Sequence, residues 1–373
     1  MITYLDCAAT SFPKPPKVTD EMCRCMREYC GNPGRGSHIM ALRASEVIYK
    51  CRESACELFG CPSPENAVLT LNATHALNIA IMGLVPEGSH VIISDMEHNS
   101  VLRPVEYLKR TKGVSYSVFS TKGDIGENIR RLITPKTSAV ICNHSSNIIN
   151  RTLPQAEIGE LCRNAGILFI LDASQSAGVH DINMERDGIS ALCFPGHKGL
   201  LGPEGCGMAL FYDGVIPRPL MYGGSGVNSE EISMPDFLPD RLEAGTMSAP
   251  CAAGLLEGIK YVKNRKTRSI LLHEKSLTDR LFDRYENSPL LTVYGERGGG
   301  LFLFTVKDQT PQKTGALLNE HGICVRTGLH CAPLAHKTVG TPPGGAVRLS
   351  VGPLTLQSDI LRFIHVMDKY ILS

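Results

Sequence analysis

One lysine in this chain stands where a primary amine could do covalent chemistry. Lys198 follows a short apolar run at residues 191–194 and lies among glycines and prolines in the sequence FPGHKGLLGPEG. This composition predicts a rigid turn at the end of a buried strand, where burial would lower the pKa of the amine. A lysine of this kind can hold an aldehyde cofactor as a Schiff base, and pyridoxal 5′-phosphate (PLP) is the obvious candidate.

A carboxylate upstream fits the same chemistry. Asp172 ends the apolar run at residues 167–171, which predicts a second buried strand. An aspartate there can pair with the protonated pyridine nitrogen of PLP and keep the ring an electron sink. Each residue alone has an ordinary explanation, since strand-end aspartates often form turns and lysines among glycines often lie in loops. Their combination favours a cofactor site.

Residues suited to a phosphate follow another apolar run. Residues 72–75, Asn-Ala-Thr-His, come after the predicted strand at 68–71 and precede a predicted helix from residue 76. The N–H groups that begin a helix can bind a phosphate, and the Thr74 hydroxyl can assist them. His197 can also donate to a phosphate oxygen. A helix N-cap at 72–75 and a turn-capping histidine at His197 are the alternatives.

Three further polar residues follow predicted strands and could contact the cofactor ring. His98 can stack on a planar ring, and Asn147 and Gln175 can donate to its phenolate oxygen. A surface-loop histidine is the alternative for His98. Because ligands of α/β sheets bind at the carboxyl ends of the strands, we expect all these candidates to lie close together.

The last third of the chain adds a thiol and a guanidinium. Cys331 follows His330 in a segment, residues 326–335, without a helical or strand pattern. A loop thiol flanked by basic groups can have a lowered pKa and act as a nucleophile. Arg348, on a predicted strand at 347–350, has the planar fork that binds a carboxylate. With 14 cysteines in the chain, a merely structural Cys331 stays open, as does an ordinary ion pair for Arg348.

Length and composition indicate how many domains the chain has and which partners it lacks. At 373 residues the chain favours two domains, and 38 basic against 37 acidic residues provide no field for nucleic acid or an anionic membrane. Neither a spanning helix nor a signal peptide is expected, so the predicted location is cytoplasmic. The cysteines are spread along the chain, which favours free thiols in a reducing compartment. The group at 23–30 fits no zinc spacing, and no metal site is expected.

The order of elements must bring these residues together. Short apolar runs alternate with helical patterns, including helices at 100–111 and 155–165, and predict an α/β domain with a mostly parallel sheet. A long loop is expected at 223–239. A smaller α+β domain should follow, with strands at 301–305, 323–326 and 347–350 and a final helix after residue 357.

With these residues in place, the chain resembles, almost end to end, the class V aminotransferase-like PLP enzymes, and within them the cysteine desulfurase and selenocysteine lyase group. The matching stretches are residues 4–9, 35–38, 72–75, 96–99, 146–147, 172–175, 196–198, 243–246, 326–331 and 348. The resemblance implies the fold type I of PLP-dependent transferases, with helices on both faces of the large sheet. It also implies an N-terminal segment (1–17) that packs with the small domain, a large PLP-binding domain (18–255) and a small domain (256–373).

The resemblance also implies a role for each candidate. Lys198, Cys331 and His98 would be catalytic, with Cys331 taking sulfur from the substrate as a persulfide while alanine is released. His38, Asn147 and Arg348 would bind the substrate, L-cysteine or selenocysteine. The implied cofactor-binding residues are Ala73, Thr74, His75, His98, Asn147, Asp172, Gln175, His197 and Lys198, with Thr246 from the neighbouring subunit of a homodimer.

Departures from the family pattern leave alternatives open. Pro195 stands where the family usually has a phosphate-binding serine, and Ala73 and His75 replace the more common Thr and Glu. Another class V reaction, such as that of an aminotransferase, epimerase or carbon–sulfur lyase, would not require Cys331. A PLP-binding scaffold with little turnover is a further alternative, favoured by Pro195. A sulfur-acceptor protein is expected, and iron–sulfur assembly, thiolation and selenium metabolism are all open as its pathway.

Overall fold

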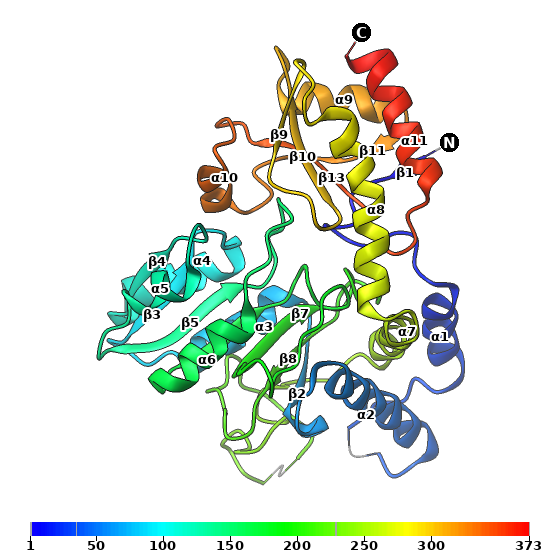
Figure 1. Ribbon diagram of the computed structural model, residues 1–373. Helices are drawn as coiled ribbons and strands as arrows, with labels where there is room; N and C mark the ends of the chain where they lie inside the picture. The colour runs from blue at the N-terminus through cyan, green and yellow to red at the C-terminus, as the bar shows by residue number, and fades with distance from the viewer. Residues whose placement is uncertain (1, 35, 228–229, 373) are drawn as a thin grey trace.

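A seven-stranded sheet forms the centre of the molecule (Figure 1). The computed structural model describes residues 2–34, 36–227 and 230–372. Strand β8 runs antiparallel to both of its neighbours, and the other strands run parallel to one another, which confirms the mostly parallel sheet. In spatial order the strands are β2 (Ala67–Thr70), β8 (Gly207–Phe211), β7 (Ala191–Pro195), β6 (Leu168–Asp172), β5 (Thr137–Asn143), β3 (His90–Ser94) and β4 (Ser115–Phe119).

Helices cover both faces of this sheet, because its inner strands are apolar on both sides. On one face, α2 (Ile39–Phe59), α6 (Gln155–Ala165) and α7 (Ala249–Arg265) share a core with the sheet. On the other face, α3 (Ala73–Leu84) and α4 (Asn99–Lys112) do so. Neighbouring residues of β3 alternate between the two cores, with Ile92 in the first and Val91 and Ile93 in the second.

A second sheet belongs to the C-terminal part. It is antiparallel, in the order β12 (Arg326–Gly328), β13 (Ala346–Ser350), β10 (Leu301–Val306) and β9 (Leu291–Tyr294). Helix α8 (Thr267–Tyr285) and helix α11 (Gln357–Val366) pack on it around a separate apolar core. The remaining elements are α1 (Pro16–Glu28), the 3₁₀ turn Pro64–Asn66, α5 (Ile125–Arg130), α9 (Pro311–Glu320), α10 (Pro333–Val339) and the π-turn Met367–Ile371.

The N-terminus crosses to this C-terminal part. Strand β1 (Thr3–Tyr4) pairs in parallel with β11 (Ile323–Cys324), and Asp6 forms a bridge with Ser350. The strand expected at 323–326 is therefore wrong as one element: β11 pairs with β1, whereas β12 turns to pair with β13. An apolar pattern does not reveal such a change of partner.

Two other expectations concern segments outside regular structure. The described residues of 223–239 contain no helix or strand, which confirms the long loop. The segment 326–335 is more ordered than expected, because it includes β12 and the start of α10. The expected domain boundary at 255/256 falls inside α7, which packs against α1 and α2; the division into 1–17, 18–255 and 256–373 stays a prediction. No helix in the described ranges is long and apolar enough to cross a membrane.

Candidate functional site

The carboxyl ends of the central strands surround a cavity of about 110 Å³. Strand β6 ends at Asp172 beside it, and the turn after β7 contributes Lys198. Of the residues predicted for the site, this cavity brings together Ala73, Thr74, His98, Asn147, Asp172, Gln175, His197 and Lys198. The expectation that residues at separate strand ends meet at one edge of the sheet is met for this group.

Lys198 lies on a turn held by backbone hydrogen bonds. The Gly196 N–H donates to the Cys206 carbonyl, and the Leu201 N–H donates to the Lys198 carbonyl at 2.9 Å. Burial lowers the pKa of the Lys198 amine to about 8, although the nearby Asp172 charge opposes the shift. A larger fraction of the amine is therefore neutral near pH 7 than for an exposed lysine, and a neutral amine is the nucleophilic form.

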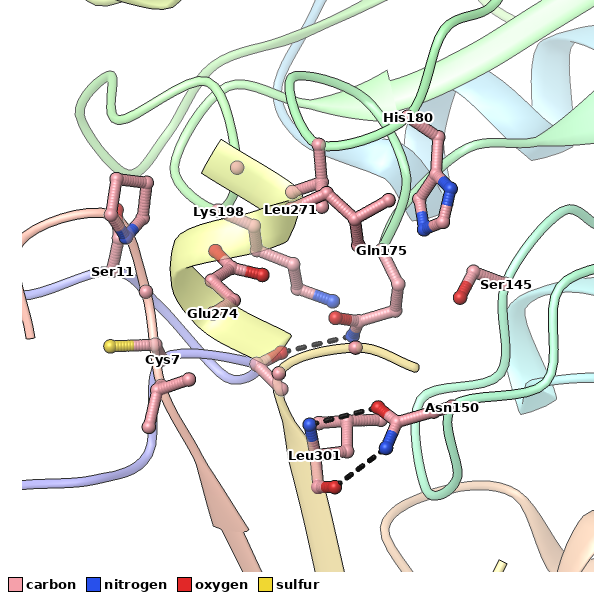
Figure 2. Close-up of a pocket in the computed structure, with 18 of the residues that line it drawn as sticks. Cys7, Ser11, Ser145, Asn150, Gln175, His180, Lys198, Leu271, Glu274 and Leu301 are labelled. Carbon is pink, nitrogen blue, oxygen red and sulfur yellow. Dashed lines mark hydrogen bonds between the residues drawn. The ribbon is translucent and has the colours of Figure 1, made fainter. Parts of the chain in front are cut away.

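A second cavity, of about 60 Å³, lies on another side of the Lys198 side chain. Figure 2 shows Lys198, Gln175 and Glu274 around it. The Gln175 amide nitrogen donates to the Ala8 carbonyl at 3.0 Å, which ties the N-terminal segment to the site. Glu274, on α8, is 6 % exposed, and burial raises its pKa to about 8. Lys198 thus stands between two partly desolvated spaces.

Asp172 is buried and held in one orientation. Its Oδ1 accepts from the backbone N–H of Ser174 at 2.9 Å and from the Ser174 hydroxyl at 2.5 Å. This is the turn-forming role that the sequence also allowed. The same carboxylate lines the cavity and acts electrostatically on the Lys198 amine, so the turn and the cofactor role are compatible.

His98 caps helix α4. Its Nδ1 accepts from the backbone N–H of Ser100 at 3.0 Å, so the neutral ring carries its proton on Nε2. Burial and the nearby Lys198 charge lower its pKa, although Asp172 opposes this. The Ser100 hydroxyl hydrogen-bonds to His98 Nδ1 at 2.9 Å and to the Thr74 hydroxyl at 2.8 Å. Sequence reasoning missed Ser100, which lines the cavity within the helix that His98 begins.

The start of α3 faces the same cavity. Asn72 caps the helix by accepting from the His75 N–H at 2.9 Å, so that N–H is already engaged. Those of Ala73 and Thr74 make no hydrogen bond with the described residues. The His75 ring does not line the cavity; its Nδ1 accepts from the Leu71 N–H. Ala73 and Thr74 are therefore better placed than His75 for a phosphate.

Two polar atoms at the cavity are buried and without a partner among the described residues. They are Nδ1 of His197 and Oδ1 of Asn147. Burial lowers the pKa of His197 to about 4, so its ring is neutral near pH 7. The Asn147 amide nitrogen donates to the His330 carbonyl at 2.7 Å. Buried polar atoms normally have partners, so their lack of one here indicates room for a polar ligand.

Arg348 lies behind the cavity, almost fully buried on β13. Its Nη2 donates to Asp6 at 2.9 Å and its Nη1 donates to the Asn147 carbonyl at 2.8 Å, while Nε is buried without a partner. Burial lowers the pKa of Arg348, although Asp6 opposes this. Arg348 therefore forms the ordinary ion pair that the sequence left open, with Asp6 as its partner. Asp6, which also pairs with the exposed Arg326, was missed, although it lies within the matching stretch 4–9.

Cys331 is exposed, on a loop between β12 and α10. His330 and Cys331 have φ of +50° and +56°, in the left-handed region that costs free energy for residues other than glycine. The Cys331 carbonyl accepts from the Asn99 N–H at 2.8 Å, and His330 Nδ1 lies 3.0 Å from His336 Nε2. Cys331 lines a cleft of about 570 Å³ that shares Thr74, His98 and Ser100 with the Lys198 cavity.

Two predicted residues lie away from the cavity. His38 is exposed and caps α2, with its Nδ1 accepting from the Ala41 N–H at 3.3 Å. Thr246 is exposed and lines a different cavity, of about 620 Å³. The buried Glu243 holds that loop by accepting from Arg52 at 2.6 Å and from the Leu69 N–H at 2.7 Å. Arg35, from the matching stretch 35–38, lies outside the described residues.

A further residue that sequence reasoning missed is Glu97, directly before His98. It is fully buried, and burial raises its pKa to about 8. Its Oε1 accepts from the Ser94 hydroxyl and from the Asn143 N–H, which links the ends of β3 and β5 behind the cavity. The only signal for it in the sequence is its place in the stretch 96–99.

Comparisons with known proteins agree with this geometry. The profile of the aminotransferase class-V family matches residues 3–363. A probable cysteine desulfurase of Methanothermobacter thermautotrophicus is 32 % identical over 93 % of this chain and 89 % of its own. The cysteine desulfurase of Haloferax volcanii is 27 % identical over 98 % and 89 %, respectively.

Solved structures show the same fold. The cysteine desulfurase of Thermococcus onnurineus NA1 superposes with a TM-score of 0.91 at 27 % identity, over 99 % of this chain and 94 % of its own. The cysteine desulfurase CsdA of Escherichia coli has a TM-score of 0.89 at 23 % identity over the same shares, which supports the fold alone. The fold is therefore that of the PLP-dependent transferases of type I, as expected. The chain belongs to the aminotransferase class-V family, within its cysteine desulfurases.

Proposed function

We propose that this enzyme uses PLP to convert L-cysteine into L-alanine and leaves the sulfur on Cys331 as a persulfide. The observation that carries the proposal is that two reactive groups line adjoining spaces, which share Thr74, His98 and Ser100. The cavity contains the Lys198 amine, whose pKa is lowered to about 8, and the cleft is lined by the exposed Cys331.

The residues around the cavity fit PLP. Lys198 would hold it covalently, Asp172 would face the pyridine nitrogen, His98 would stack on the ring, and Gln175 and Asn147 would contact the phenolate side. When bound, PLP supplies an electron sink for the negative charge that develops at the substrate Cα. The Asn147 amide nitrogen donates one hydrogen to the His330 carbonyl and has a second one for the phenolate oxygen, while its unpartnered Oδ1 would accept from a donor of the ligand.

Pro195 cannot bind the cofactor phosphate as the family's serine would, but neighbouring residues can. The N–H groups of Ala73 and Thr74 and the Thr74 hydroxyl would bind the phosphate at the start of α3. Ser100, which hydrogen-bonds to Thr74, would supply the hydroxyl that Pro195 lacks. His197 would donate through its unpartnered Nδ1. Thr246 would reach this site from the other subunit of a homodimer.

Substrate binding would use the buried guanidinium behind the cavity. Arg348 would take the cysteine carboxylate through its unpartnered Nε edge, while Asp6 holds the rest of the fork. Asn147 and His38 would complete the substrate site. Once substrate has displaced it, the neutral Lys198 amine would take the α-proton and return it.

Sulfur transfer would need Cys331 as a thiolate. Its sulfur attacks the substrate sulfur; the new S–S bond forms as the Cβ–S bond breaks, the electron pair returns to Cβ, and Cβ is protonated to give alanine. We propose selenocysteine as a second substrate, a cytoplasmic location and transfer of the sulfur to an acceptor protein, with iron–sulfur cluster assembly among the open destinations.

Replacing Cys331 with Ala tests the proposal. We expect PLP binding to persist and desulfuration of cysteine to fall at least about 100-fold, because the nucleophile is lost. Alanine and sulfide would be measured with cysteine as substrate, and Cys23→Ala, at an exposed thiol on α1, is the matched control. Unchanged desulfuration in Cys331→Ala would favour another class V reaction that needs no thiol.

A further inference from the structure

The cleft beside Cys331 adjoins the Lys198 cavity, with which it shares Thr74, His98 and Ser100, and extends away from it. It lies between α3, which contributes Asn78 and Met82, and α4, which contributes Arg103 and Tyr107. Its volume of about 570 Å³ is in the range of ligand-binding clefts. Cys331 is exposed and lines this cleft but not the Lys198 cavity, so a molecule bound at the outer end of the cleft is offered the sulfur from outside.

Arg103 gives this cleft a positive charge. Its exposed side chain makes no hydrogen bond or ion pair with the described residues. The nearest acid along α4, Glu106, is engaged with Arg110 at 2.8 Å. No acidic side chain is among the described residues that line the cleft. A guanidinium with no carboxylate partner at the edge of a cleft favours an anionic ligand.

From these observations we propose that the cleft between α3 and α4 receives the cysteine of a sulfur-acceptor protein that carries an acidic residue beside it, with Arg103 binding that carboxylate. The inference rests on the proposed function, because it needs sulfur on Cys331. The polar Asn78 and the apolar Met82 and Tyr107 would contact the backbone and neighbouring side chains of the segment.

The transfer step balances without a further reagent. The acceptor thiolate attacks the outer sulfur of the Cys331 persulfide, and a new S–S bond forms on the acceptor. The bond between the two sulfurs at Cys331 breaks, and Cys331 leaves as a thiolate. The acceptor thus carries the persulfide away, and Cys331 is ready for the next cysteine.

The test uses the PLP-loaded enzyme and three acetylated, amidated tripeptides that differ only beside the cysteine: Gly-Cys-Asp, Gly-Cys-Asn and Gly-Cys-Lys. Formation of the peptide persulfide would be followed by mass spectrometry. We expect kcat/KM for the Asp peptide to exceed that for the Asn peptide about fivefold, and the Lys peptide to be poorest. The preference should shrink as salt is added, because the ion pair is exposed.

Charge reversal gives the sharper result. Arg103→Glu should invert the order of the peptides and Arg103→Gln should abolish it. Lys109→Glu, which makes the same change of charge on α4 at a residue that contacts Tyr116, should leave the order unchanged. Equal rates for the three peptides in the wild type, or the same order in Arg103→Glu, would overturn the inference.

The first turnover separates this inference from the proposed function. One equivalent of alanine should form without any acceptor, in the wild type and in the Arg103 variants. Because the Arg103 charge also acts on the pKa of His98, the peptides are compared within each variant and not between variants. No alanine in this burst would contradict the desulfurase itself. A normal burst with no charge preference among the peptides would contradict the cleft alone.

Discussion

The Lys198 cavity and the Cys331 loop hold reactive groups in opposite ways. Lys198 lies at the edge of the central sheet among buried polar groups, and desolvation shifts the pKa of its amine to about 8. Cys331 is exposed on a loop from the C-terminal part. A dry site raises the fraction of the amine that is neutral near pH 7, whereas the thiol in its proposed role has to reach both a substrate and an outside acceptor. The first group is controlled by burial and the second by backbone geometry.

The geometry of the Cys331 loop has a free-energy cost that its surroundings must offset. Two consecutive residues with positive φ cost roughly 1–3 kcal/mol each. Hydrogen bonds from Asn147 to the His330 carbonyl and from the Asn99 N–H to the Cys331 carbonyl oppose that cost. Asn147 also lines the Lys198 cavity, so this one side chain links the two regions.

Removing the buried carboxylate of Asp6, which pairs with Arg348 and Arg326, should have the largest effect. Asp6→Ala leaves Arg348 buried without its partner, and we expect the free energy of unfolding to fall by about 3–5 kcal/mol. Arg326→Ala, which removes the exposed partner of Asp6, should cost at most about 1 kcal/mol. Urea denaturation of both variants measures this; equal losses would show that burial does not govern this ion pair.

Asp172→Asn tests the electrostatics of the dry site. We expect kcat to fall about 100-fold, because the negative charge that would stabilise the protonated pyridine nitrogen of the cofactor is lost. Asp172 raises the pKa of Lys198, so its removal should lower that pKa further and move the amine's titration to lower pH. The kcat of the loaded enzyme would show the first effect, and the pH dependence of PLP uptake by the PLP-free protein, in which the Lys198 amine is free, would show the second. If the Lys198 amine titrated at the same pH in Asp172→Asn as in the wild type, Asp172 would not act on the pKa of Lys198.

Glu274→Gln tests desolvation alone, since no hydrogen bond from the described residues reaches this carboxyl group. The folded protein holds the Glu274 proton up to about pH 8, whereas the unfolded chain releases it near 4.5. Between these values the native state binds more protons, so stability should fall as pH rises, by at most about 1.4 kcal/mol per pH unit.

The Gln variant should lack this contribution to the pH dependence of stability. Urea midpoints at pH 6 and pH 8 would measure it, with the exposed Glu320→Gln as control. If the wild type and Glu274→Gln lose stability equally between these pH values, the side of Lys198 that faces α8 is not a desolvated space.

His336→Ala tests the Cys331 loop and should have the smallest effect on activity. His336 is buried and lies 3.0 Å from His330 Nδ1 and 2.7 Å from the Thr341 hydroxyl through its two ring nitrogens. Loss of this link should slow Cys331-dependent alanine formation about fivefold while the cofactor spectrum stays unchanged. His336→Gln, which keeps a polar group, should recover part of the rate. An altered cofactor spectrum would show that the two regions are not independent.

The fold was predictable where local pattern decides it. Apolar runs such as 139–142 and 191–194 predicted β5 and β7, because strands buried on both faces are continuously apolar. The partner change between β11 and β12 was not predictable, since it depends on the distant β1 and β13.

The same division applies to the site. Lys198 and Asp172 could be found because each follows an apolar run at a strand end. Asp6 and His336 could not, because their partners, Arg348 and His330, are brought to them only by tertiary packing. Thr246 lies away from the cavity within one chain, so its proposed role would need a second subunit, which the sequence of one chain does not position.

The most direct test of the account is whether Lys198 carries the cofactor. The PLP-loaded protein would be reduced with borohydride, digested and mapped by mass spectrometry. The account predicts one stable adduct, on the peptide that contains Lys198, and its absence in Lys198→Ala. An adduct on Lys14, the other lysine near this turn whose pKa is lowered to about 8, or no uptake of PLP at all, would contradict it.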